Sequence, residues 1–384
     1  MSIVKNATYH NNKGDLFTSF DVADFDVPAG RDEVWRFVPL RRLRGLHDGS
    51  FKPADAMDIS VSAPVGVRVE TVDSTDERLR AAGGAVDRVG AQVWSSAHGG
   101  TMVTVNQDLD EPVNITITGR GLDVTTFGLL GIELKDNVRA TVNVHYVGTG
   151  THADVTTVIV GDNAQLTMIN HEDWNEDGLH LGSMKALMKK DSVLRHNSAC
   201  FGGELVRLVP AVKFTAPGGD AEMLGVYFAD DGQFFEQRLL VDHAVANCRS
   251  NVLYKGALQA DPDSDLPEAR TSWVGDVLIR SGAQGTDTYE ANRNLVLTEG
   301  ARADAVPNLE IETGNIVGAG HAATVGRFDD EQLFYLRSRG IPESEARRLI
   351  VRGFFSEVIG RIPVAEVRDE LEARVTEELK NTQL

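Results

Sequence analysis

One short turn-like phrase recurs through the middle of the chain, at Lys135-Asp136-Asn137-Val138, Gly161-Asp162-Asn163-Ala164, Lys190-Asp191-Ser192-Val193 and Gly219-Asp220-Ala221-Glu222, and more loosely at Glu299-Gly300-Ala301-Arg302. The aspartates of the first four copies are 26, 29 and 29 residues apart. A repeat of this length is typical of stacked architectures in which each repeat forms one coil. Asp, Asn and Gly suit tight corners because they tolerate left-handed and turn conformations. The phrase therefore predicts the corners of a β-solenoid.

The segments between these corners alternate apolar and polar residues, as half-buried β-strands do. Clear examples are residues 102–106, 113–117, 140–144 and 164–168. Two-residue hairpin turns are scarce, with Asp-Gly pairs only at Asp48-Gly49, Asp177-Gly178 and Asp231-Gly232, which argues against an antiparallel sandwich. Stacked coils leave open strand edges at both ends, and such edges have to be capped or paired with another chain.

The chain divides into three regions on these patterns. Residues 1–90 form a mixed N-terminal region with short helical stretches at 32–43 and 76–82, residues 91–326 form the β core, and residues 327–384 form a helical domain. Apolar residues recur at three- and four-residue intervals in the last region, which predicts helices with two apolar stripes. The stripes are Ala346, Leu349, Ile350, Phe354 and Val358, then Val364, Val367, Leu371, Val375 and Leu379.

Composition narrows the possible partners and the compartment. The formal net charge is −19, which opposes binding to nucleic acids and anionic membranes. No apolar run approaches the roughly 18–20 residues that cross a bilayer, and the N-terminus lacks a signal-peptide pattern, so we expect a cytoplasmic protein. Cys200 and Cys248 show no CxxC spacing, which argues against a disulfide framework and against a zinc or iron–sulfur site held by this chain alone.

Motifs of enzyme chemistry are incomplete wherever they begin. Asp173, Asn175, Asp177 and Gly178 match an EF-hand loop, but its twelfth position is Met184 instead of the bidentate Glu, so we interpret residues 171–180 as a solvated acidic corner. The glycines near residue 318 lack the βαβ context of a dinucleotide site. No GxxxxGK[ST] or GxSxG motif is present. The sequence therefore predicts a protein that is not an enzyme.

The junction between the β core and the helical region carries a lone histidine, His321, among small residues from Gly318 to Arg327. Acidic residues from 329 to 331 then favour a helix N-terminus, and Gly340 suits its C-terminal cap. On residue type alone, a histidine in such a segment is more often a hydrogen-bonded structural group than a ligand.

Several segments resemble the SufB/SufD family of the SUF iron–sulfur cluster assembly machinery. Residues 320–327 and 330–341 are similar to the SufD version of the family's C-terminal pattern, and residues 33–40, 293–297 and 307–311 also look like family segments. The resemblance reaches from about residue 33 to about residue 360. It implies a right-handed parallel β-helix flanked by helical ends, which agrees with the solenoid predicted from the repeat.

The resemblance also implies a function as a scaffold subunit. Such a chain pairs with a SufB-like paralogue and docks a SufC-like ABC-type ATPase on its C-terminal helices. His321 would lie where the two paralogues meet and take part in building the nascent iron–sulfur cluster, with a thiol from SufB. Some relatives have a cysteine two residues before this histidine, where this chain has Ala319. No cofactor is then expected to bind stably to this chain alone.

For the ATPase dock we select aromatic residues, Arg and one aliphatic residue of the helical region, since large aromatics and Arg dominate many interfaces. The selected residues are Phe334, Tyr335, Arg339, Ile350, Phe354 and Phe355. Two other functions remain open at this stage. One is a β-helical carbohydrate-active enzyme, and the other is a solenoid that associates with itself as a homodimer. Whether flavin or iron is bound in an assembled complex also remains open.

Overall fold

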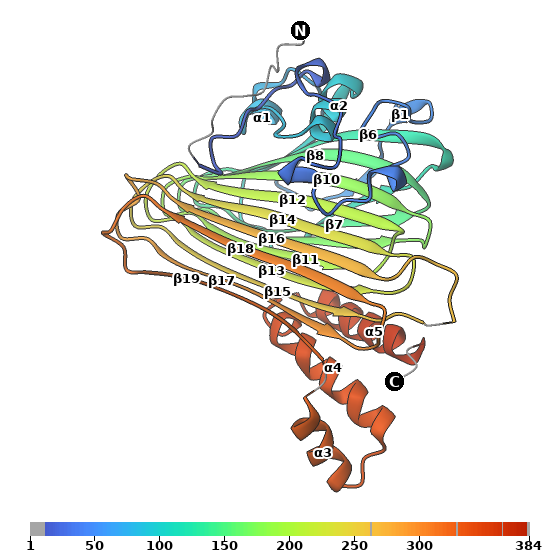
Figure 1. Ribbon diagram of the computed structural model, residues 1–384. Helices are drawn as coiled ribbons and strands as arrows, with labels where there is room; N and C mark the ends of the chain where they lie inside the picture. Colours follow the sequence, from blue (N-terminus) through green and yellow to red (C-terminus); the bar gives the residue numbers. More distant parts are fainter. Residues whose placement is uncertain (1–11, 262, 328, 363, 382–384) are drawn as a thin grey trace.

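The computed structural model describes residues 12–261, 263–327, 329–362 and 364–381. From β4 onward, each strand pairs in parallel with the strand two positions further along the chain, so that two parallel sheets form opposite walls of a solenoid (Figure 1). One sheet contains β4 (Gly99–Val105), β6 (Gly121–Leu134), β8 (Gly150–Val160), β10 (Leu179–Met188), β12 (Leu205–Phe214), β14 (Phe234–His243), β16 (Arg270–Ile279) and β18 (Arg302–Ile311). The other contains β5 (Val113–Thr118), β7 (Arg139–Gly148), β9 (Gln165–Trp174), β11 (Val193–Cys200), β13 (Asp220–Ala229), β15 (Arg249–Leu258), β17 (Asp287–Val296) and β19 (Gly318–Gly326). The predicted β-solenoid is confirmed.

The corners between the sheets use left-handed residues, as the repeat predicts. Asn137, Asn163 and Asp191 have φ angles of 64°, 56° and 53°. In the fourth copy the left-handed residue is Gly218, and Asp220 already begins β13. The backbone N–H groups of these corners donate along the stack, for example from Asn137 to the Asp162 carbonyl at 2.8 Å. Each corner therefore supports the next, and the spacing of the phrase fixes the length of a coil.

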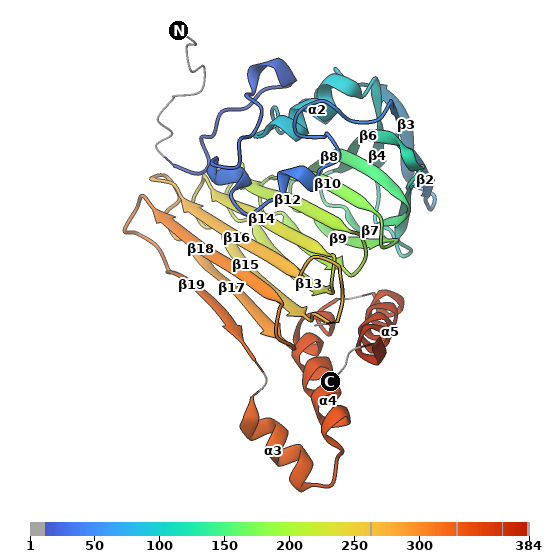
Figure 2. The same cartoon turned by 45° about the vertical axis from the view of Figure 1, so that its right-hand side comes forward.

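One end of the solenoid is closed. Strands β2 (Asp58–Ser62) and β3 (Val67–Asp73) pair antiparallel with β5 and β4, and β1 (Ala54–Ala56) pairs with β6. Helices α1 (Glu77–Arg80) and α2 (Arg88–Ser96) pack beside the same sheet, on β6 and β8 (Figure 2). The interior is filled by a continuous set of inward-facing Val, Ile, Leu, Met and aromatic side chains. The core is thus covered at this end, where the antiparallel strands β2 and β3 form the edges of the two sheets.

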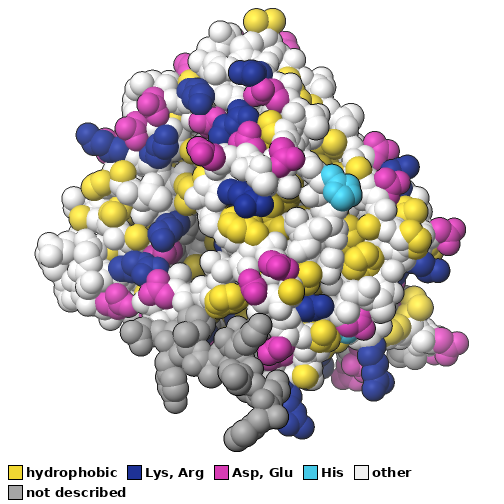
Figure 3. Space-filling view, turned by 90° about the horizontal axis from the view of Figure 1, so that it is seen from above, with side chains coloured by type: hydrophobic (Ala, Val, Ile, Leu, Met, Phe, Trp, Pro, Cys, Tyr) yellow, Lys and Arg dark blue, Asp and Glu magenta, His cyan; other side chains and the backbone are white. Residues whose placement is uncertain are grey.

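The helix expected at residues 32–43 is instead two 3-10 turns, Glu33–Trp35 and Leu40–Arg42, because Pro39 interrupts the segment; a further 3-10 turn spans Val22–Asp24. Arg42 and Arg44 form ion pairs with Glu204 of the solenoid, at 3.2 and 2.5 Å. These two arginines therefore hold the N-terminal segment onto the coils. In Figure 3, which looks onto this end, basic and acidic side chains are interspersed over the surface.

The chain ends in three helices, α3 (Asp330–Ser338), α4 (Glu343–Ile359) and α5 (Ala365–Asn381). Helix α4 packs on β13 and β15, and its buried face joins that of α5 in one apolar cluster with side chains of this sheet. Val358 and Leu371 are among the buried residues, so the outer face of the sheet supplies the cover that both stripes need. Helix α3 contacts α4 and projects away from the solenoid (Figure 1). None of the described helices has the length and apolarity required to span a bilayer.

Candidate functional site

The second end of the solenoid is open. Strands β18 and β19 are the last strands of their sheets, and within the described residues each is paired on one side only, with β16 and β17. Most residues of β18 are half-buried, whereas strands in the middle of the stack are almost wholly buried. A strand edge of this kind presents unpaired backbone donors and acceptors, which another chain can extend.

His321 lies on the open-end strand β19. It is paired in register with Glu290 of β17, and register partners on parallel strands point to the same face. Glu290 faces the interior, so His321 also points inward, but no later coil covers it and 45% of its side chain is exposed. The Nδ1 atom of His321 is 3.9 Å from Glu290 Oε1. The structure thus places the predicted site residue at an accessible, inward-facing position on the open edge.

Glu290 is a buried carboxylate without a side-chain hydrogen-bond partner. Its side chain is fully buried, and neither oxygen accepts a hydrogen bond from a described side chain, although the Asn308 backbone amide lies near the carboxylate. Burial, together with the nearby charge of Asp276, raises the pKa of Glu290 to about 8, against a smaller opposing effect of the Asn308 backbone amide. A Cβ atom on Gly275 would lie 2.5 Å from Glu290 Oε2, so the glycine makes room for the carboxylate. The sequence analysis did not identify Glu290. Its alternation with Thr288 and Asn292 places it on the inward face of β17, but the pattern does not show whether the carboxylate has a partner there.

The residues selected for a dock fall into three groups. Phe334 and Tyr335 are exposed on α3, and Arg339 is exposed at its C-terminal cap, with its guanidinium 5.2 Å from the Tyr335 ring centre. Ile350 and Phe354 are half-buried on α4. The Phe354 carbonyl accepts a hydrogen bond from Lys255 at 2.7 Å. The third group is Phe355 alone, whose side chain is buried.

Phe355 is fully buried, with its ring centre 6.4 Å from that of Phe228 on β13. It is a core residue that fastens α4 to the solenoid, and its side chain is not available to a partner in this conformation. An aromatic residue in an apolar stripe has the same sequence signature whether it faces a sheet of its own chain or another protein, so the pattern alone could not separate these two cases.

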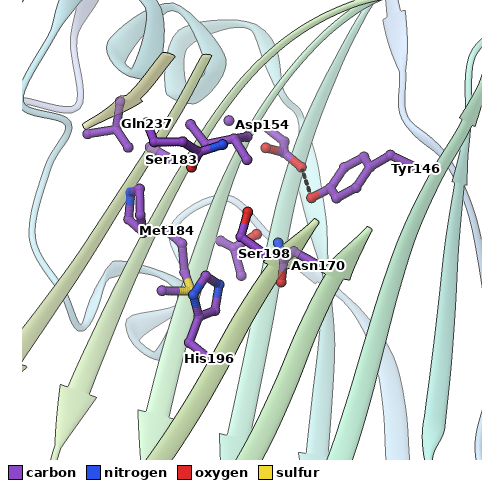
Figure 4. A pocket seen from close by; sticks show the side chains of 13 residues that line it. Tyr146, Asp154, Asn170, Ser183, Met184, His196, Ser198 and Gln237 are labelled. Carbon is purple, nitrogen blue, oxygen red and sulfur yellow. Dashed lines mark hydrogen bonds between the residues drawn. The ribbon is translucent and has the colours of Figure 1, made fainter. Parts of the chain in front are cut away.

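A polar network crosses the closed half of the interior. His180 donates from Nδ1 to Glu172 at 2.8 Å, and its Nε2 lies 3.1 Å from Asp154. Burial alone would lower the pKa of His180, but these two carboxylates outweigh it and raise the pKa to about 10. Tyr146 donates to Asp154 at 2.7 Å, beside a water-sized cavity of about 20 Å³ (Figure 4). Glu172 and His180 are buried, so only residues 175–177 form the acidic corner expected for this segment.

Two clusters have the donor atoms for a metal ion: His152, Asp154 and His180 in the interior, and His145, His171 and Asp173 near α5. In the first, both ring nitrogens of His180 are hydrogen-bonded to carboxylates and His152 Nδ1 is hydrogen-bonded to Thr126, so most of the donor atoms are already in use. In the second, the His145 and His171 rings stack with centres 4.7 Å apart, and Arg374 of α5 lies 3.5 Å from Asp173. A guanidinium beside the carboxylate opposes cation binding there.

The two cysteines are buried and form no disulfide. Burial raises the pKa of both thiols, that of Cys200 well above its usual value with a further contribution from Glu172. A thiolate is the form that binds metals and attacks electrophiles. Neither thiol is therefore poised as a ligand or nucleophile.

A cavity of about 520 Å³ lies between the N-terminal segment and the sheet that contains β10 and β12. Its lining includes Lys185, whose pKa is lowered by burial to about 8, but also the carboxylates Asp87 and Asp242. Charges of both signs line the cavity, so it indicates no particular class of cofactor.

The chain is similar in sequence to known iron–sulfur cluster assembly proteins. Residues 116–354 match the family described as SUF system FeS cluster assembly, SufBD core domain. The chain is 57% identical to an iron-sulfur cluster assembly SufBD family protein of Mycobacterium bovis, over 97% of this chain and 94% of the relative. It is 56% identical to such a protein of Mycobacterium leprae, over 97% and 95% of the two chains. A second SufBD family protein of Mycobacterium leprae is 27% identical over 57% of this chain and 24% of its own length.

Proposed function

This chain belongs to the SufBD family of the SUF iron–sulfur cluster assembly system, and we propose that it acts there as the SufD-like, non-catalytic scaffold subunit. The choice of SufD over SufB rests on the SufD-like wording of residues 320–341. In this proposal the chain pairs with a SufB-like paralogue and docks a SufC-like ABC-type ATPase on residues 327–384. The cluster is cargo that passes through the complex.

The open end of the solenoid is the observation that carries the proposal. The stack of parallel strands ends there at β18 and β19, which are uncapped among the described residues, whereas at the opposite end the antiparallel strands β2 and β3 cover the last coil. A paralogue with the same repeat could add its own edge strands to both. The two SufBD family proteins of Mycobacterium leprae make such a pairing of unlike family members reasonable.

His321 fits the proposed assembly site in its chemistry. Imidazole is a good ligand for iron beside thiolate or sulfide sulfur. This chain has no thiol beside His321, because Ala319 stands where some relatives have a cysteine. Its two cysteines, Cys200 and Cys248, are buried. Sulfur would therefore come from the partner, and His321 would take up the cluster at the shared edge.

The helical region supports the proposed ATPase dock. Phe334 and Tyr335 are 74% and 55% exposed on a helix that leaves the solenoid, and large exposed aromatics mark interaction surfaces. Helix α4 connects this surface to β13 and β15. A movement of the ATPase during its nucleotide cycle would thus reach the sheet whose last strand carries His321.

The test is co-expression with the SufB-like and SufC-like proteins of the same source, with purification through a tag on this chain. We expect all three chains to be recovered with the native protein. His321→Ala should keep the complex but lose cluster assembly, whereas Thr324→Ala on the same strand should keep both. Phe334→Ala with Tyr335→Ala should lose the ATPase but keep the paralogue.

Two results would contradict the proposal. Recovery of this chain alone as a stable homodimer would favour a self-associating solenoid. Full cluster assembly by the His321→Ala complex would remove the histidine from the site.

A further inference from the structure

We propose that Glu290 is a second iron-binding residue, so that its carboxylate and the His321 imidazole together hold a ferrous ion at the open end of the solenoid. The inference rests on the proposed function for its choice of iron. It adds a ligand from this chain, which the sequence pattern with Ala319 does not supply.

The first argument is the state of the carboxylate. An ionised carboxylate buried without donors is strongly unfavourable, and buried charges in proteins are normally paired or bound to metals. Both oxygens of Glu290 lack a side-chain hydrogen-bond donor in the described structure, the Asn308 backbone amide has only a small effect, and the neighbouring Asp276 adds negative charge. The indole N–H of Trp273, another buried group without a partner, is not used to satisfy it. The raised pKa of Glu290, about 8, means that a proton neutralises the carboxylate at neutral pH, and a metal cation could take the place of that proton.

The second argument is the distance to His321. Two ligands that share one ion at bond lengths of about 2.1 Å lie roughly 3–4 Å apart. The His321 Nδ1 and Glu290 Oε1 atoms are 3.9 Å apart, and nearly half of the His321 side chain is exposed, so it can adjust without disturbing the core. Imidazole and carboxylate form a donor pair that suits divalent iron. The remaining coordination positions would face the open end, where a partner could supply sulfur.

The third argument is the space around the carboxylate. Gly275 on β16 lies beside Glu290, and any Cβ there would meet Oε2 at 2.5 Å and the Trp273 ring at 2.2 Å. The cavity for this carboxylate thus depends on a glycine on the opposite wall. The carboxylate thus has room around it but no side-chain donor, so its lone pairs are available to a metal ion.

The experiment measures metal binding by the full-length chain without partners, under anaerobic conditions. Equilibrium dialysis follows Fe²⁺, and optical absorption follows Co²⁺ as a probe. His145→Ala serves as the background, because it removes the other accessible donor cluster. In that background we expect one ion per chain. Glu290→Gln and His321→Ala should each weaken binding by at least about tenfold, since even outer-shell partners of metal ligands are worth roughly 10–100-fold.

The matched control is Asp287→Asn, a carboxamide substitution three residues earlier on β17, where the side chain faces Arg249. It should leave the affinity unchanged. Thermal unfolding of each variant checks that the chain is folded, and Gln has nearly the same shape as Glu.

The outcomes separate this inference from the proposed function. Unchanged binding in Glu290→Gln, or no binding by the background chain, overturns the second ligand but leaves the scaffold function standing. Failure of the three-chain complex to form, with metal binding still lost in Glu290→Gln, retains the site and removes the scaffold assignment.

Discussion

Two buried glutamates show how the halves of this solenoid differ. Glu172 in the closed half accepts hydrogen bonds from His180 and from the Trp174 indole, both at 2.8 Å. Glu290 at the open end is equally buried and accepts none from a described side chain. The two side chains occupy inward-facing positions of the same sheet. The difference is that coils lie on both sides of Glu172, whereas a single strand separates Glu290 from the open end.

This comparison locates function where stacking stops. In the closed half, Asp154 and Glu172 both accept hydrogen bonds from side chains of neighbouring strands, so this network stabilises one conformation. At the open end the neighbouring coil is missing, and a buried carboxylate, a histidine and two sheet edges are left for another molecule. A solenoid of similar repeats can thus form a site at the end where the last coil has no neighbouring coil.

The largest effect should come from breaking an ion cluster that joins the N-terminal segment to the closed half. Arg207 is 2% exposed, bonds to Asp87 at 2.8 Å and Glu236 at 3.0 Å, and lies 4.2 Å from the Trp35 ring centre. Arg207→Met leaves two buried carboxylates without their cation, so the free energy of unfolding should fall by about 3–5 kcal/mol. Urea unfolding followed by circular dichroism measures it.

The control for that experiment is Arg302→Met at the open end. Arg302 is exposed and pairs with Asp304 at 2.7 Å. Ion pairs in contact with solvent contribute little, so the unfolding midpoint should stay unchanged. Equal losses of stability in Arg207→Met and Arg302→Met would mean that buried ion pairs do not stabilise the closed half more than exposed pairs stabilise the open end.

The second prediction exchanges the two glutamates for glutamine. Glu172→Gln removes the charge that His180 binds, and hydrogen bonds to charged groups contribute about 1.5–3 kcal/mol, so the protein should be destabilised by that amount. Glu290→Gln removes a charge that has no partner, so the isolated chain should be as stable as the native protein or more stable. Urea unfolding at pH 8.5 compares them. A comparable loss in both would show that Glu290 has a structural partner.

The third prediction concerns the protonation of buried histidines. His180 has a pKa raised to about 10 by Glu172 and Asp154 against the effect of burial, whereas burial alone lowers the pKa of His196 to about 4 and of His243 to about 3. Nitrogen NMR of histidine-labelled protein should show His180 as imidazolium at pH 8.5. The same spectra should show His196 and His243 neutral at pH 5.5.

The stability change linked to His180 has a definite sign. Its native pKa lies above the value of about 6.5 in the unfolded chain, so the native state binds more protons between pH 6.5 and pH 10. The stabilisation is complete below pH 6.5 and is lost as the pH rises toward 10. A neutral His180 at pH 8.5 would show that the network is weaker than its distances suggest.

The sequence contained most of the fold. The spacing of the Asp phrases and the alternation between them were enough for the solenoid, because corner residues and inward-facing residues obey local rules. The open end was also foreseeable, since stacked coils always leave edges. The attachment of the N-terminal segment to the coils could not be predicted, because Arg42 and Arg44 bind Glu204, which is 160 residues or more away in the sequence.

The site could be predicted only in part. His321 stood out in a segment of small residues, but Glu290 lies in a strand with ordinary alternation, and the absence of a partner is visible only in three dimensions. Phe355 shows the opposite problem. Its stripe predicted an apolar face correctly, and only the structure shows that this face covers β13 and β15 of the same chain.

The smallest effect should come from the corners, and it tests whether the two halves differ in anything besides stacking. Asn163 in the closed half and Asn247 toward the open end both have left-handed backbones, with φ of 56° and 57°. Alanine is strained in this conformation and glycine is not, while glycine gains freedom in the unfolded chain, so Ala should be less stable than Gly by about 1 kcal/mol at each position. Urea unfolding of the four variants gives the two differences. Equal differences would mean that the corners are local and alike throughout, so that the contrast between Glu172 and Glu290 arises from the missing coil alone. A smaller difference at Asn247 would mean that the backbone relaxes near the open end, and the exposure of His321 would then reflect a loosened coil as well as an absent one.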